Sequence, residues 1–222
     1  MQNRLRSYDI PHKALRNALS QLSLLAGKTD FSDKKEVEQL YYLGTDVFMM
    51  LNKHAEDENE VVLADLELRC PGASKHDTED HAALHVAQHK LEELLNKIHT
   101  DTIAGKDVAA DGAEFYLSFT EYHGIYLEHT AEEERVTQPL LWKYFTDEEL
   151  MGHRGQIMSK MPPEMLFKWF RFILPAQNQM ERTATMTGIK QMAPAPFFAQ
   201  VMELAEKVIS PVELEKLQRA IA

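Results

Sequence analysis

Hydrophobic residues recur along this chain with the three-to-four-residue spacing of an α-helix, and no convincing segment alternates with the two-residue period of a strand. Four long helices are therefore predicted, over residues 11–26, 33–66, 78–102 and 110–145. Gly27 and the Cys70-Pro71-Gly72 turn are expected to end the first two. The pattern predicts an all-α fold built on a four-helix bundle.

Beyond residue 145 the apolar segments shorten and the signals for helix starts multiply. Thr146 with Glu149 forms a capping-box pattern. Further starts are predicted at three proline-containing sites, which are Pro162-Pro163, Pro194 and Ser210-Pro211. Pro175 is expected to interrupt one of these short helices. We expect a bundle domain over residues 1–146 and a C-terminal helical extension over residues 147–222 that packs on the bundle.

The apolar stripes of the second and fourth predicted helices are each interrupted by a histidine and a glutamate four residues apart. These pairs are His54 with Glu58 and His129 with Glu133. The stripes are expected to resume at Val61, Val136 and Leu140. Because residues four apart share a helix face, and because each pair lies in register with its stripe, these side chains are predicted to point into the core.

A second repeat relates the first and third helices. His12 and His81 each begin the pattern H-x-A-L-x-x-A-x-x-x-L-x-x-L. The chain thus consists of two helical hairpins, each with a single histidine on one helix and H-x-x-x-E on the next. One H-x-x-x-E is a weak signal, and His89 with Glu93 is a third instance to which we give no weight. The recurrence in register is what carries the prediction.

This arrangement has a chemical consequence. A buried carboxylate without a partner is very costly, so two glutamates and four histidines in one core call for a cation among them. Imidazole with carboxylate suits iron, zinc or manganese, and two carboxylates that can bridge suit a pair of ions. The alternative is that the histidine–glutamate pairs lie on a solvated acidic face, or that His12 and His81 are surface residues near helix starts.

The remaining histidines carry less information. His85 follows His81 by one turn and is left open as an additional ligand. The others are predicted to lie at the surface or in loops: His76, His89, His99, His123 and His153.

The composition excludes several classes of protein. There are 24 Lys and Arg residues against 35 Asp and Glu residues, and the resulting net charge of -11 argues against nucleic-acid binding. The most apolar stretch, residues 165–174, is too short to cross a membrane, and no signal peptide is visible. With one cysteine, Cys70, no internal disulfide can form, which favours a reducing compartment. We expect a cytoplasmic protein.

Together these segments resemble the hemerythrin-like, cation-binding HHE family. The matching pieces begin at Pro11-His12, Leu51, Asp80-His81 and Tyr126, and they cover roughly residues 8–145. The resemblance implies an up-down four-helix bundle that holds two iron ions joined by an oxo or hydroxo group. It implies four terminal nitrogen ligands, which are His12, His54, His81 and His129. It also implies two bridging carboxylates, which are Glu58 and Glu133.

The set of four histidines and two glutamates is more similar to the di-iron proteins of iron–sulfur repair and nitrosative stress than to respiratory oxygen carriers. Three functions are therefore weighed. The first is a di-iron protein that senses or handles O₂, NO or peroxide. The second is an oxidase-like or peroxidase-like enzyme on the same scaffold. The third is a helical interaction module without metal, whose C-terminal helices dock a partner or form a homodimer.

Overall fold

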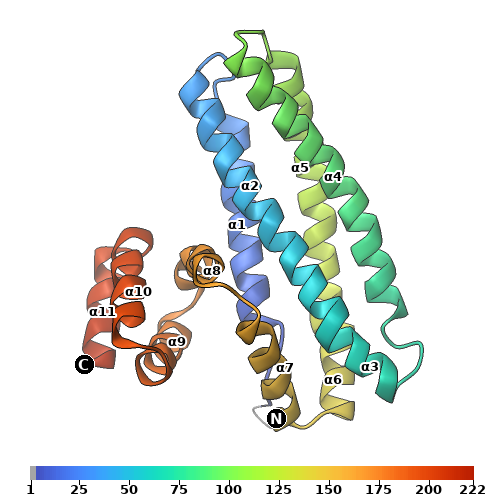
Figure 1. The fold of residues 1–222 in the computed structure, drawn as a ribbon, viewed down its shortest axis with the longest axis vertical. Coiled ribbons are helices and arrows are strands. Elements are labelled where there is room, and N and C mark those ends of the chain that lie inside the picture. Colours follow the sequence, from blue (N-terminus) through green and yellow to red (C-terminus); the bar gives the residue numbers. More distant parts are fainter. Residues whose placement is uncertain (1–3) are drawn as a thin grey trace. The chain divides into compact units, whose positions relative to one another are not determined.

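The computed structural model describes residues 4–222, and within that range every regular element is helical (Figure 1). The long helices are α1 (Asp9–Lys28), α2 (Lys34–Asp57), α4 (Lys75–Ile103) and α5 (Ala109–Glu132). Two π-helical segments and two short helices continue α2 and α5: η1 (Glu58–Leu63), α3 (Ala64–Arg69), η2 (Glu133–Thr137) and α6 (Gln138–Tyr144). The C-terminal helices are α7 (Asp147–Ser159), α8 (Pro163–Ala176), α9 (Gln179–Met192), α10 (Ala195–Val208) and α11 (Pro211–Ile221). The predicted all-α class is confirmed.

These helices form two compact units. The first comprises Ala18–Lys160 with the described part of Met1–Tyr8, and the second comprises Asp9–Asn17 with Met161–Ala222. Helix α1 contributes to both, and α7 belongs to the first. The domain boundary expected after residue 146 stays a prediction.

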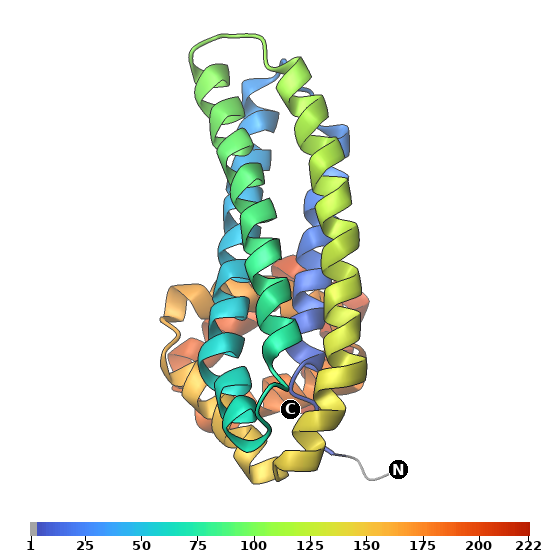
Figure 2. The same ribbon diagram turned by 90° about the vertical axis from the view of Figure 1, so that its right-hand side faces the viewer.

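In the first unit, consecutive long helices run in opposite directions and lie side by side (Figure 2). The stripes predicted from the sequence form its core, in which Leu22, Leu40 and Phe119 have no exposed surface. Helices α2 and α4 approach closely at Gly44, where an added Cβ would clash with Cδ2 of Leu95. A glycine is therefore needed at this crossing.

The two predicted long helices that carry H-x-x-x-E are each interrupted by a π-helical segment that begins at the glutamate. Segment η1 begins at Glu58 and η2 begins at Glu133. A π turn takes in one more residue than an α turn, so the inward face shifts along the sequence. Val136 is consequently 50% exposed, whereas Thr137 and Leu141 are buried. The predicted inward position is therefore wrong for Val136, whereas Val61 is buried as predicted and Leu140 is half-buried against the core.

Helix ends follow the local sequence signals with two exceptions. The capping boxes at Thr146 and Ser210 are formed, and Asn178 forms another. Helix α1 continues past Gly27 to Lys28, and α8 contains Pro175. Pro175 is the penultimate residue of α8, so the helix ends one residue beyond the predicted interruption.

A cluster of apolar side chains closes the end of the bundle beyond the two glutamates. Tyr8, Leu66 and Leu141 pack there with Leu150 of α7. Arg4 fastens the segment that precedes α1, because its guanidinium donates to Asp147 and to the carbonyl oxygens of residues 142 and 145 at 2.7–2.9 Å.

The second unit has its own core. Its buried apolar residues include Phe172, Met186, Val201 and Leu217. Arg182 is almost fully buried and donates to the carbonyl oxygens of residues 174 and 177 at 2.7 Å. In the part of the chain that the structure describes, no helix is both long and apolar enough to cross a bilayer.

Candidate metal centre

The six residues predicted as ligands come from four helices. His54 and Glu58 lie at the α2–η1 junction, and His129 and Glu133 at the α5–η2 junction. His81 projects from α4, and His12 lies in the first turn of α1. All six side chains are buried, with between 0% and 6% of their surface exposed. Burial of this many ionisable groups excludes the alternative of a solvated acidic face.

Glu58 places its two oxygens against imidazoles from different helices. Its Oε1 is 3.2 Å from Nε2 of His54, one turn earlier on the same helix. Its Oε2 is 3.3 Å from Nε2 of His81 on α4. The carboxylate of Glu58 therefore lies between imidazoles from two neighbouring helices, α2 and α4.

Glu133 occupies the corresponding position in the other hairpin. Its Oε1 is 3.4 Å from Nε2 of His129, again one turn earlier on the same helix. The same oxygen is 3.4 Å from Nε2 of His81. His81 thus faces both carboxylates.

The donor atoms gather in two groups. The first group consists of His12, His54, Glu58 and Glu133, and the second of His81, His129 and Glu133. Within each group, one donor atom of every residue lies within 4.8 Å of the donor atoms of the others. Glu133 is common to both. Nitrogen and carboxylate donors in this mixture fit iron, zinc or manganese, and a shared carboxylate fits two neighbouring ions. The structure brings the six predicted residues together, and their role as ligands stays a prediction.

The electrostatics of His81 reflect its position between the carboxylates. Burial alone lowers the pKa of an imidazole, but hydrogen bonds and charge from Glu133 and Glu58 outweigh it. The pKa of His81 is raised from 6.5 to about 10. A proton on His81 therefore partly neutralises the two carboxylates when no metal is bound, and a metal ion would neutralise them more fully.

The negative charge of the cluster also reaches two neighbouring groups. Burial, with the charges of Glu58, Glu133 and Asp77, raises the pKa of Tyr8 well above its ordinary value. The pKa of Asp77 is raised chiefly by burial, which exceeds the opposing effect of the hydrogen bond that Thr137 donates to it at 2.7 Å. Both shifts are caused chiefly by burial, and the charges of Glu58 and Glu133 add to them in the same direction.

Two residues outside the predicted set orient the ligands. Asn59 Oδ1 is 2.9 Å from Nδ1 of His81, and Asp80 Oδ2 is 3.4 Å from Nδ1 of His129. Partners of this kind keep the Nε2 atom of a ligating imidazole directed at the metal. Neither residue is predicted from the sequence, because each lies next to a ligand and its side chain falls outside the apolar stripe. Only the packing of α4 against its neighbours reveals them.

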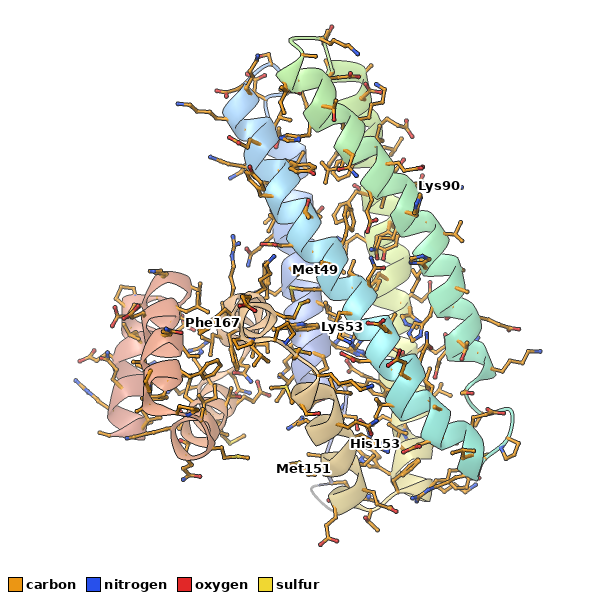
Figure 3. All side chains as sticks on the ribbon, in the orientation of Figure 1. Met49, Lys53, Lys90, Met151, His153 and Phe167 are labelled. Carbon is orange, nitrogen blue, oxygen red and sulfur yellow. The ribbon has the colours of Figure 1, made fainter. Side chains whose placement is uncertain are left out.

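His85, left open from the sequence, is exposed. Its Nδ1 is 3.3 Å from Asn52 Oδ1, and it belongs to neither buried group. The prediction for His153 is wrong, since this residue of α7 (Figure 3) is buried. His153 packs its ring edge against Phe145 and its Nε2 is 2.9 Å from Asp65 Oδ2, a partner too distant in sequence to be predicted.

The other histidines divide by exposure. His76 and His89 are exposed, in agreement with the prediction for them. His99 and His123 are half-buried, and the ring of His99 stacks on Tyr41 with centroids 3.8 Å apart. None of these four lies in the buried cluster.

Comparison with known proteins agrees with this geometry. Residues 5–141 match the family described as the hemerythrin HHE cation binding domain. The chain is 27% identical over 155 residues to the F-box/LRR-repeat protein 5 of Danio rerio, an alignment that covers 67% of this chain and 21% of the relative. The chain thus spans about a fifth of that relative's length, and no solved structure matches. Since the family match covers more than half of the chain, this protein belongs to the hemerythrin HHE cation-binding family.

Proposed function

We propose that the buried cluster holds two iron ions and that the protein senses or handles a small ligand such as O₂, NO or a peroxide. The observation that carries the proposal is the sharing of carboxylates. Glu133 belongs to both groups of donors, and the two oxygens of Glu58 face imidazoles from different helices. Shared carboxylates of this kind are typical of dinuclear sites in helical bundles.

In this proposal the two hairpins contribute equally. Glu58 and Glu133 would supply the carboxylates shared by the ions, and four imidazoles would supply the nitrogen ligands: His12, His54, His81 and His129. Two iron ions held by these residues would supply one-electron redox chemistry and could bind a diatomic molecule or a peroxide.

The chain's own residues shape the site in three ways. Burial of all six donors keeps bulk water away from them. Asn59 accepts the Nδ1 proton of His81, and Asp80 faces Nδ1 of His129, so both rings keep Nε2 toward the carboxylates. The apolar cluster around Leu66 and Leu141 closes one end of the bundle. A small ligand fits this enclosure better than a bulky substrate does.

Metal content tests the first part of the proposal. The protein is produced in iron-rich medium, purified without oxygen and analysed for iron, zinc and manganese. We expect about two irons per chain and near-ultraviolet absorption from iron in the oxidised protein. Glu133→Gln should lower the iron content, whereas His85→Ala, which changes an exposed histidine outside the cluster, should not. Fewer than about one iron per chain, or zinc in its place, would contradict a di-iron centre.

Spectral titration tests the second part. The reduced, iron-loaded protein is exposed in turn to NO, O₂ and hydrogen peroxide while its visible spectrum is recorded. A saturable change with at least one of them is expected. If two irons are bound but none of the three changes the spectrum, the small-ligand role fails and the metal site stands. Continuous peroxide turnover with a reductant would instead favour an enzyme.

A further inference from the structure

A separate group of potential ligands lies at the surface of the bundle, on α4 and α5. His76, Asp80 and Glu132 each offer one donor atom, and these atoms lie within 4.8 Å of one another. Nε2 of His76 is 3.0 Å from Glu132 Oε1, and its Nδ1 is 3.8 Å from Asp80 Oδ1. An imidazole with two carboxylates is a donor set for a divalent transition-metal ion. Unlike the buried donors, all three side chains are at least 35% exposed.

Asp80 connects this surface group with the buried cluster. Its Oδ1 faces His76, while its Oδ2 is 3.4 Å from Nδ1 of His129. The opposite nitrogen of His129 is 3.4 Å from Glu133. A second connection runs along the backbone, because Glu132 ends α5 and Glu133 begins η2. The surface group thus contacts a predicted ligand of the buried centre directly, through Asp80.

Helix α4 also carries a pair that lacks this connection. His89 and Glu93 have the same four-residue spacing, with His89 Nδ1 3.7 Å from Glu93 Oε2, and both are well exposed. Among the described residues, this pair joins no group of three potential ligands. It therefore provides a matched control for the surface group.

We propose that His76, Asp80 and Glu132 form a surface acquisition site that holds a divalent transition-metal cation before it reaches the buried centre. The inference rests on the proposed function, since it requires a metal to be loaded. The buried donors expose at most 6% of their surface, so an incoming cation has to exchange water for protein ligands on the way. Two carboxylates at the surface raise the local cation concentration, and Asp80 presents one oxygen outward and one toward His129.

The test measures the rate at which metal-free protein takes up Fe²⁺. The wild-type chain, His76→Gln, Glu132→Gln and the control His89→Gln are mixed with Fe²⁺ without oxygen, quenched with a chelator at successive times, desalted and analysed for iron. Both variants of the surface group should reach the wild-type iron content about tenfold more slowly at low ionic strength. His89→Gln should load at the wild-type rate, and added salt should reduce the difference between variants.

The other possible outcomes would contradict either the acquisition site or the proposed function. Wild-type rates in both surface variants would overturn the acquisition site. A lower final iron content reached at an unchanged rate would also overturn it, because the His76–Glu132 pair would then serve only to hold α4 against α5. If the wild-type chain itself takes up no iron, the proposed function fails, and that failure is distinguishable from a loss of loading rate alone. Far-ultraviolet circular dichroism of each variant verifies that the helices are intact.

Discussion

The hydrogen bond between Asn59 and His81 allows a quantitative test of how the buried ligands are held. Nδ1 of His81 is 2.9 Å from Asn59 Oδ1, while its Nε2 faces Glu58 and Glu133. When a metal ion takes Nε2, the ring proton has to lie on Nδ1, where Asn59 accepts it. Asn59→Ala removes this acceptor and leaves the metal-binding nitrogen in place.

The expected effect is on metal affinity rather than on folding. Loss of an outer hydrogen bond to a metal-ligating imidazole lowers affinity by about 10–100-fold, which is about 1.4–2.8 kcal/mol of binding free energy. Asn59 itself is largely exposed, so the free energy of unfolding of the metal-free protein should change by no more than about 0.5 kcal/mol.

The chain offers a matched control. Asn52 faces Nδ1 of the exposed His85 at 3.3 Å, which is the same pair of residue types between α2 and α4 but outside the buried cluster. Metal-free variants are titrated with Co²⁺ in competition with a chromophoric chelator. Asn59→Ala should bind about 10–100-fold more weakly, Asn59→Asp should recover most of the affinity, and Asn52→Ala should bind as wild type. Equal affinities for Asn59→Ala and the wild type would refute the reasoning.

Three further predictions concern stability. Metal at a thousand times its Kd should stabilise the fold by about 4 kcal/mol, raising Tm by about 8–16 °C in a thermal melt, and His54→Ala should abolish this shift. Gly44→Ala places Cβ against Leu95 and should destabilise by about 1–3 kcal/mol in urea unfolding, whereas Gly124→Ala, which meets nothing, should stabilise by about 0.5–1 kcal/mol. The guanidinium of Arg69, which is hydrogen-bonded to Glu149, lowers the pKa of Glu149 from 4.5 to about 2. The stabilisation that the Arg69–Glu149 pair provides is therefore complete above pH 4.5 and is lost as the pH falls through 2. Glu149→Gln should accordingly be less stable than the wild type at pH 7 and approach it below pH 2; an unchanged difference would contradict this.

The sequence predicts the parts of this protein that depend on periodicity. The four long helices and the inward direction of His54 and His129 follow from apolar residues at helical spacing, because each such residue reports on the face of its own helix. Features set by contacts between distant segments leave no such trace. The burial of His153 depends on Asp65 of another helix, and the orientation of His81 depends on Asn59 across the contact between η1 and α4.

The π-helical segments explain why the residues predicted to face the core differ from those that do so after Glu133. The residues that follow Glu58 and Glu133 differ, Asn-Glu-Val against Glu-Arg-Val, yet both helices widen from that glutamate onward. The widening thus recurs at the same place in both hairpins, at the glutamate of H-x-x-x-E, and π segments inside α-helices are frequent at functional sites. In both hairpins a buried carboxylate is directed at an imidazole of a neighbouring helix. The extra residue lets each glutamate keep that direction while Leu66 and Leu141, beyond it, still reach the apolar end of the core.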